Sequence, residues 1–352
     1  MPKNLYVVEG NTIEVFRNSV VQAINPLNYS FFLESVANAK GRFRDRYWRY
    51  TAQIGDSNPV LNFKIQNERK RLISESGNVT INVVTKKSSP ASMKYLLQIG
   101  DSFIDHGWIS QELHRRLLTN TTEDGITGDG LSNITFVGNR ETGDIPNEAL
   151  GGQTLNYYRG SDSPFWNPNT SQIDFDYYCS SVLSPSIPQL DFVQIMLGTN
   201  DFNTVGLDAN GNINYTELAP RWRQILDKLI AHNPAIKIIV TGRILEVPLG
   251  GGGYLALNQD NQYYWNRAVQ VFGYNRMLEG IAEEAAYASN TLFVDALPVL
   301  DMEYNMPYIE EAANIRNSTL VKRGDDNVHP APSGSKQIAD AWYHATHHFF
   351  LE

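Results

Sequence analysis

The chain has 352 residues, of which 42% are hydrophobic and 19% are charged. This length exceeds the roughly 250–300 residues at which a single hydrophobic core stops growing, so two domains are expected. The 29 basic and 38 acidic residues give a net charge of −9, which argues against nucleic acid or an acidic membrane surface as the main partner. The apolar runs are too short for a transmembrane helix, so membrane insertion is not expected.

One cysteine, Cys179, is present, which excludes an internal disulfide framework and a cysteine-based metal cage. We expect a buried or partly buried thiol with no catalytic role. The N-terminal residues Met1-Pro2-Lys3-Asn4 lack the apolar core of a signal peptide. The localisation stays open, because a leader can be removed from a secreted protein.

The first 90 residues contain short segments rich in β-branched and aromatic residues, separated by Gly, Asn, Pro and Asp. The segments are 5–8, 12–16, 29–33, 47–50, 60–65 and 79–84. This spacing is typical of a small antiparallel β-sandwich. Residues 86–90 have the composition of a linker, so residues 1–90 are predicted to form an accessory domain that helps to shape the cleft of the second domain.

Residues 91–352 alternate between strand-like and helix-like segments. Strands are predicted at 95–99, 134–137, 191–197, 236–241 and 292–294, and helices at 108–118, 218–232, 267–288 and 333–349. Such alternation predicts an α/β domain with a parallel sheet covered on both faces. Functional side chains are then expected in the loops at the carboxyl ends of the strands.

The tetrapeptide Ile-Gly-Asp-Ser occurs at residues 54–57 and again at 99–102. The first copy runs into Asn58-Pro59 inside the strand-rich region, so it is predicted to be a plain turn. The second copy follows an apolar strand and opens a helix, which places Ser102 at the helix N-terminus. Ser102 is there either a helix-capping serine or a nucleophile whose environment favours a negative oxygen.

Two further loops place polar side chains near the same edge of the sheet. Asn200 follows the strand at 191–197, and its amide can donate a hydrogen bond to a developing oxyanion. Its alternative role is that of a turn-forming residue. Asp326 precedes His329 by three residues, a spacing that allows the carboxylate to accept a hydrogen bond from the imidazole. Without the other motifs, His329 would be read as an ordinary surface histidine.

Taken in order, four short motifs resemble the conserved blocks of the SGNH (GDSL-like) hydrolase family. They are Gly100-Asp101-Ser102, Gly151-Gly152-Gln153-Thr154, Gly198-Thr199-Asn200-Asp201 and Asp326-x-x-His329. The match extends from residue 94 to the end of the chain. The resemblance implies a three-layer α/β/α flavodoxin-like fold for residues 91–352 and ester hydrolysis without a metal or cofactor.

The resemblance also implies a role for each matching residue. Ser102 would be the nucleophile, His329 the general base and Asp326 the residue that orients the imidazole. The oxyanion hole would consist of the Ser102 N–H, the Gly152 N–H and the Asn200 side chain. Gly152 is preferred to Gly151 because it directly precedes the x-Thr pair of the second block. Asp101, Gly198 and Asp201 would support these loops.

The front region resembles strand-rich modules that precede the catalytic domain in some bacterial SGNH carbohydrate esterases. The resemblance rests on Arg46-Tyr-Trp48-Arg49 and on residues 145–154, although Asn147-Glu148-Ala149 replaces a His-Glu-Gly common in that branch. It implies a serine esterase that removes small acyl groups, most simply acetyl, from a small-molecule or glycan ester. The alternatives are a longer-chain lipase, thioesterase or lysophospholipase, and a surface or phage adhesin component that mainly binds glycans.

The sequence gives less specific evidence for the function of the aromatic and histidine residues outside the motifs. Loop aromatic residues are either core anchors or sugar contacts, and the candidates for substrate contact are Trp166, Tyr254, Tyr264 and Trp265. His344 and His348 have the i, i+4 spacing of a metal pair, but no third ligand is evident. Together with His347, they are expected to be solvated or to cap the last helix, and no metal site is predicted.

Overall fold

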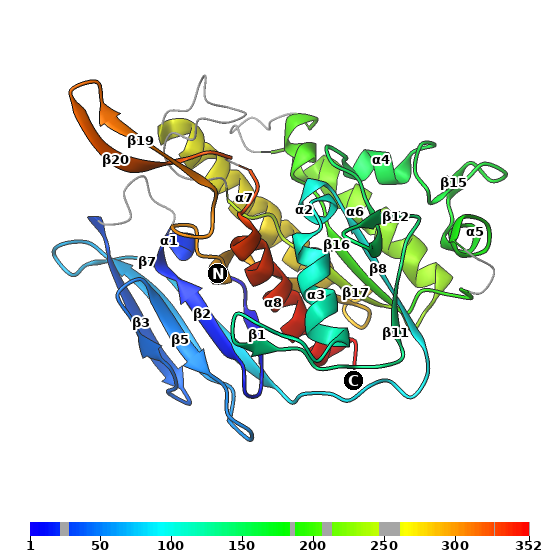
Figure 1. Cartoon of the computed structure of the whole chain (residues 1–352), viewed down its shortest axis with the longest axis horizontal. Helices are drawn as coiled ribbons and strands as arrows, with labels where there is room; N and C mark the ends of the chain where they lie inside the picture. Colours follow the sequence, from blue (N-terminus) through cyan, green and yellow to red (C-terminus); the bar gives the residue numbers. More distant parts are fainter. Residues whose placement is uncertain (22–27, 184–186, 206–212, 246–260, 327, 352) are drawn as a thin grey trace. The chain divides into compact units, whose positions relative to one another are not determined.

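The computed structural model describes residues 1–21, 28–183, 187–205, 213–245, 261–326 and 328–351 (Figure 1). The chain divides into two compact units, each formed from several segments. Unit 1 comprises residues 1–84, 244–273 and 296–338, and unit 2 comprises residues 85–243, 274–295 and 339–352. No helix among the described residues combines the length and hydrophobicity needed to cross a bilayer.

Two β-sheets form the N-terminal part of unit 1. The first has the strand order β1-β7-β6-β3, with β1 at Asn4–Val8, β7 at Leu72–Val84, β6 at Val60–Gln66 and β3 at Ser30–Ala37. The second has the order β2-β5-β4, with β2 at Thr12–Phe16, β5 at Tyr47–Thr51 and β4 at Arg42–Phe43. A short helix, α1, spans Arg17–Val20.

The prediction that these strands are all antiparallel is wrong at one pair, because β1 runs parallel to β7. After β1 the chain turns at Gly10, which has φ +80°, and enters β2 in the other sheet. Two strands joined by a tight hairpin turn must pair antiparallel. Because β1 is followed by a strand of the other sheet, no such turn sets its direction relative to β7. The remaining neighbours in both sheets are antiparallel.

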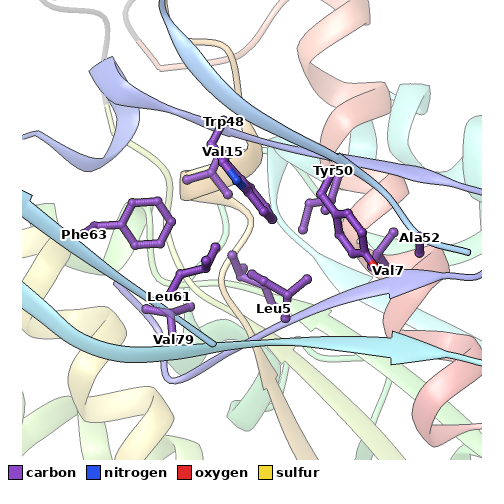
Figure 2. Close-up of a cluster of buried hydrophobic side chains, with 11 residues drawn as sticks. Leu5, Val7, Val15, Trp48, Tyr50, Ala52, Leu61, Phe63 and Val79 are labelled. Carbon is purple, nitrogen blue, oxygen red and sulfur yellow. The ribbon is translucent and has the colours of Figure 1, made fainter. Parts of the chain in front are cut away.

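One hydrophobic cluster is shared by the two sheets (Figure 2). The first sheet contributes Leu5, Val7, Leu61, Phe63, Val79 and Ile81. The second sheet contributes Ile13, Val15, Trp48 and Tyr50. Because side chains alternate between the two faces of a strand, every second residue of β1, β2, β5 and β6 points into this cluster. Trp48 is 1% exposed and is the largest side chain in it.

Unit 1 also contains a β-hairpin that the sequence analysis did not predict. It consists of β19 at Tyr308–Asn314 and β20 at Asn317–Gly324, and its strands pair antiparallel (Figure 1). The hairpin ends two residues before Asp326. A salt bridge between Arg46 and Asp301 joins the N-terminal strands to the segment that precedes the hairpin.

A mostly parallel sheet forms the centre of unit 2, as the alternation of strands and helices predicts. Its order is β12-β13-β8-β16-β17-β18, and β11 pairs with the first half of β8. The strands are β8 at Lys94–Gly100, β11 at Ile134–Val137, β12 at Arg140–Thr142, β13 at Ile145–Ala149, β16 at Phe192–Met196, β17 at Lys237–Thr241 and β18 at Thr291–Val294. The short β12 pairs antiparallel with β13.

The longer helices are α3 at Trp108–Leu118, α6 at Tyr215–His232, α7 at Asn261–Ala282 and α8 at Pro332–Phe349. Three of them follow the predicted segments closely, whereas α7 begins and ends six residues earlier than the predicted 267–288. Shorter helices are α2 at Ser102–Asp105, α4 at Leu155–Arg159 and α5 at Phe175–Tyr177. Short β-ribbons are formed by β9 at Thr122–Glu123 with β10 at Ile126–Thr127, and by β14 at Trp166–Asn167 with β15 at Gln172–Ile173.

Side-chain contacts within unit 2 show how helices attach to the sheet. In α8, Trp342 donates a hydrogen bond to Thr241 of β17, and Thr346 accepts one from Gln194 of β16 at 3.2 Å. In α6, Trp222 donates to the Tyr274 hydroxyl of α7 at 2.9 Å. The contacts of Trp342 and Thr346 hold α8 against the sheet, and the contact between Trp222 and Tyr274 joins α6 to α7.

Truncating Trp48 tests the importance of the shared cluster in unit 1. We expect Trp48→Ala to lower the free energy of unfolding by about 3–5 kcal/mol, because it removes a buried indole and leaves a cavity. Urea unfolding followed by circular dichroism measures the change. The matched control is Trp108→Ala, whose side chain is 45% exposed and whose loss should change stability little. Equal effects of the two substitutions would contradict the prediction.

Candidate active site

Ser102 lies at the junction between the central strand β8 and the short helix α2. The preceding residue, Asp101, is completely buried, and its carboxylate accepts a hydrogen bond from the Phe103 N–H at 3.2 Å. Asp101 therefore caps the helical turn that begins at Ser102. By contrast, the copy of the motif at residues 54–57 forms a turn with no helix after it.

The glycine loop that follows β13 lies beside Ser102. The Gly151 N–H donates a hydrogen bond to Asp105 Oδ2 at 2.9 Å, and a Cβ on Gly151 would lie 3.8 Å from the Ser102 Cβ. Gly152 has φ +78°, a conformation that favours glycine. Its N–H has no acceptor among the described residues, whereas that of Gly151 is occupied.

Asn200 follows β16 and begins a 3₁₀ turn, Asn200–Asn203. Its Nδ2 donates to the Gln153 carbonyl oxygen at 2.9 Å and lies 3.5 Å from Asp101 Oδ2. The structure thus brings together the loops that follow three neighbouring strands, β13, β8 and β16. The prediction that Asn200 reaches the edge of the sheet where Ser102 lies is consistent with these contacts.

Two buried carboxylates and two arginines lie under these loops. Burial raises the pKa of Asp101 to about 7, although the Phe103 N–H and the positive charge of Arg243 oppose this effect. The negative charge of Asp201 raises the pKa of Asp101 further. Burial likewise raises the pKa of Asp201, whose carboxylate accepts from the Leu155 N–H at 3.0 Å and faces Arg221 at 3.5 Å.

Gly198 permits a close approach of the backbone to a buried tyrosine. Its φ is +114°, and a Cβ at this position would lie 2.1 Å from the Tyr274 hydroxyl oxygen. That hydroxyl donates to the Leu197 carbonyl oxygen at 2.7 Å and accepts from Trp222. Any larger residue at 198 would displace Tyr274 from the end of β16.

Sequence reasoning missed two residues that support these loops, Arg243 and Tyr274, and it grouped a third, Tyr158, with the loop aromatic residues that are either anchors or sugar contacts. Tyr158 is 2% exposed, and its hydroxyl lies 2.6 Å from the Gly100 carbonyl oxygen and 2.8 Å from that of Glu148. Arg243 is 4% exposed, lies over the Phe202 ring at 4.3 Å, and follows β17. A basic residue two positions after the end of a buried strand is the one signal that could have indicated Arg243.

Asp326 and His329 lie in unit 1, in the loop before α8. The His329 Nδ1 is 2.7 Å from Asp326 Oδ2, as the three-residue spacing predicts, and Asp326 Oδ1 accepts from the N–H groups of Val328 and His329 at 2.7 and 3.1 Å. Burial raises the pKa of Asp326, but these hydrogen bonds outweigh it and hold the pKa below its usual value. The carboxylate is therefore ionised and fixes the ring, while the catalytic roles of the pair stay predictions.

The predicted substrate-binding aromatic residues are only partly covered by the described structure. Trp166 is half-buried in β14. Tyr254 lies outside the described residues, and Tyr264 and Trp265 belong to α7, with side chains that also lie outside them. Tyr158 and the neighbouring Phe165 are buried against each other, so they anchor the loop.

The interpretation of the histidines near the end of α8 as solvated is wrong for two of them. His344 and His347 are 4% and 0% exposed, because α8 buries them against unit 2. His347 Nε2 lies 2.7 Å from Asp129 Oδ2, and its Nδ1 accepts from the Lys87 N–H at 3.0 Å. No cluster of His, Cys, Asp and Glu among the described residues has the arrangement of a metal site.

Cys179 is buried, as expected. Burial raises the pKa of its thiol to about 12, so the thiolate is scarce at neutral pH. Its sulfur lies 3.9 Å from His232 Nε2, but that nitrogen already accepts from the Leu190 N–H at 2.9 Å. The Cys179–His232 pair is thus structural.

Comparison with known proteins identifies the family. A model of the GDSL-like lipase/acylhydrolase family matches residues 99–337, which is more than half of the chain, so the chain belongs to this family of ester hydrolases. This range includes all four predicted motifs. A search of curated protein sequences finds no match.

The chain is also similar to several solved structures. The chain is similar to a carbohydrate esterase family 3 protein from Talaromyces cellulolyticus (18% identity, 71% of this chain and 95% of that chain, TM-score 0.42). It is also similar to a peptidoglycan O-acetylesterase (12% identity, 72% of this chain and 90% of that chain, TM-score 0.42). A third similar structure is an extracellular lipase from Streptomyces rimosus (12% identity, 71% of this chain and 98% of that chain, TM-score 0.36). At these TM-scores, no substrate is transferred from them to this chain.

The electrostatic support of Asp101 leads to a prediction about pH. When Arg243 is replaced by Met, the cation that lowers the pKa of Asp101 is lost, so this pKa rises further and more Asp101 is protonated near neutral pH. We expect the acidic limb of the kcat/KM profile for p-nitrophenyl acetate to move to higher pH. Arg223→Met, which removes a surface partner of Glu284, should leave the limb in place. Superimposable profiles for wild type and Arg243→Met would contradict the prediction.

Proposed function

We propose that this family member is a serine esterase that removes small acyl groups, most simply acetyl, from carbohydrate esters. The observation that carries the proposal is the arrangement around Ser102 at the end of the central strand. Gly151 lies beside this serine, and Asn200 is hydrogen-bonded to the same glycine loop. An acylhydrolase needs a nucleophile next to donors that can stabilise a tetrahedral oxyanion, and this edge of the sheet offers both.

In the proposed mechanism, His329 takes the proton of Ser102 as the hydroxyl oxygen attacks the ester carbonyl. Because Nδ1 is hydrogen-bonded to Asp326, Nε2 is the ring nitrogen that would carry this proton and later return it to the leaving alcohol. The ionised Asp326 stabilises the imidazolium that forms. Water then hydrolyses the acyl-enzyme with His329 again acting as base. This mechanism requires His329 Nε2 to come within hydrogen-bond distance of the Ser102 hydroxyl.

The oxyanion would be held by the N–H groups of Ser102 and Gly152 and by the Asn200 side chain. The occupied Gly151 N–H supports the choice of Gly152. The Asn200 amide nitrogen carries two hydrogens, and one of them is bonded to the Gln153 carbonyl oxygen at 2.9 Å. The other makes only a long contact of 3.5 Å with Asp101 Oδ2, and it would turn from there to the oxyanion. Each such donor typically contributes about 10²–10³ to kcat.

The organisation of the chain is also part of the proposal. We infer that residues 1–90 form an accessory β-sandwich domain and that residues 91–352 form a three-layer α/β/α catalytic domain of the flavodoxin-like type. The sharing of one hydrophobic cluster by two sheets supports the first assignment. The resemblance of residues 46–49 and 145–154 to carbohydrate esterases supports a sugar substrate.

The two copies of the Ile-Gly-Asp-Ser motif provide a matched pair of variants. We expect Ser102→Ala to lower kcat for p-nitrophenyl acetate by about 10⁴ or more, because the nucleophile is lost. Ser57→Ala alters the same tetrapeptide in a turn of unit 1 and should keep wild-type kcat. Full activity in Ser102→Ala would refute the assignment of the nucleophile.

The length of the acyl chain separates the proposed activity from that of a lipase or thioesterase. We expect kcat/KM for p-nitrophenyl esters to be highest for acetate and to fall steadily through butyrate to octanoate. Release of acetate from acetylated xylan or another acetylated glycan, lost in Ser102→Ala, is the companion measurement. A maximum at octanoate would favour a longer-chain hydrolase instead.

A further inference from the structure

A pocket on the second sheet of unit 1 is lined by an unusual number of cations. It has a volume of about 360 Å³ and includes Lys40, Arg42, Arg44 and Arg49, together with Thr51 and Gln53. Five of the ten residues from 40 to 49 are basic, in a protein whose net charge is −9. The local excess of positive charge is therefore opposite in sign to that of the whole chain.

The register of the sheet places the arginines on its outer face. Arg42 of β4 lies opposite Arg49 of β5, and Arg49 in turn lies opposite Glu14 of β2. In the next pair of β4 and β5, Phe43 lies opposite Trp48, whose indole is buried in the shared cluster. Because side chains alternate along a strand, Arg42 and Arg49 point away from that cluster. Like charges directly opposite each other on neighbouring strands destabilise a sheet unless an anion compensates them.

The nearby carboxylates compensate only part of this charge. Glu14 forms a salt bridge with Arg49, and Asp56 forms one with Lys40 at 3.0 Å. Among the described residues, Arg42 and Arg44 have no carboxylate partner. The described carboxylates therefore do not pair with two of the guanidinium groups on the wall of the pocket.

The Asp56 carboxylate in the pocket wall is held by donors other than Arg42 and Arg44. Its carboxylate accepts from the Tyr50 hydroxyl at 2.7 Å, the Gln53 N–H at 2.9 Å and Lys40. These donors, the Tyr50 hydroxyl first, lower the pKa of Asp56 to about 2, so its charge is constant at neutral pH. The turn that carries the first Ile-Gly-Asp-Ser copy is thus one wall of the basic pocket.

We propose that this pocket binds an anionic group carried by a sugar, either a carboxylate or a phosphate ester, through Arg42 and Arg44. A guanidinium pairs with either oxyanion through two parallel hydrogen bonds, while Thr51 and Gln53 supply polar atoms for neighbouring hydroxyl groups. The small volume and the overall negative charge of the chain disfavour a long polyanion. That the anion belongs to a sugar rests on the proposed function; that the pocket binds an anion does not.

The experiment uses the full chain carrying Ser102→Ala, so that no ester is hydrolysed, and isothermal titration calorimetry. The probes are trigalacturonate, glucose 6-phosphate, neutral galactotriose and inorganic phosphate. We expect trigalacturonate or glucose 6-phosphate to bind more tightly than the neutral sugar and than phosphate alone, and the stronger of the two identifies the anion. Adding Arg42→Gln and Arg44→Gln should weaken that binding by about tenfold or more, since two charge-assisted contacts are lost.

Two control variants make the result specific. Arg69→Gln changes an arginine of unit 1 whose side chain is 75% exposed and should leave the affinity unchanged. Replacing Arg42 and Arg44 by Lys keeps the charge but loses the paired geometry, so an intermediate affinity is expected and folding is preserved.

Several outcomes would overturn the proposal. They are equal affinities for the charged and neutral sugars, no binding of either charged sugar, and unchanged affinity in the Gln variant. Because binding is measured without turnover, its failure is distinct from a failure of the esterase assay.

Discussion

The buried carboxylate of Asp101 is the constraint on which the arrangement of the candidate site depends. A carboxylate that is removed from water is costly unless neighbouring groups donate to it or carry the opposite charge. The Phe103 N–H, the Asn200 amide and the charge of Arg243 supply these interactions, and they come from loops after three adjacent strands. The position of Ser102 and that of Asn200 are therefore linked through a residue that would not itself react.

Much of unit 2 could be predicted because its central strands are buried on both faces and read as continuous apolar runs. Strand β13 could not, since its residues include Pro146, Asn147 and Glu148. The last two are 0% and 1% exposed. Asn147 donates to the Thr142 hydroxyl, and Glu148 Oε1 accepts from the Asn139 N–H and the Tyr178 hydroxyl. A buried polar residue looks like a loop residue in sequence, because its partners are fixed only by the fold.

Some features of the candidate site could likewise be predicted from the sequence, and others could not. The loops of Ser102 and Asn200 could be placed at one edge of the sheet because each follows a predicted parallel strand, and Asp326 could be paired with His329 because the two are close in sequence. Tyr274 and Leu197 are separated by 77 residues, and no local pattern relates them. The histidines near the end of α8 were misread because helix-terminal composition suggests solvent, whereas α8 ends against the body of unit 2.

The attachment of α8 has a consequence for the order in which this protein acquires its structure. His347 holds the Lys87 backbone across 260 residues, and Asp340 pairs with Arg116 across 224. A ribosome releases the chain from its N-terminus, so strands β8, β16 and β17 emerge well before the helix that covers them. Until α8 has been synthesised, the nascent sheet of unit 2 keeps an apolar face exposed, and this interval is when a cell would need a chaperone for it.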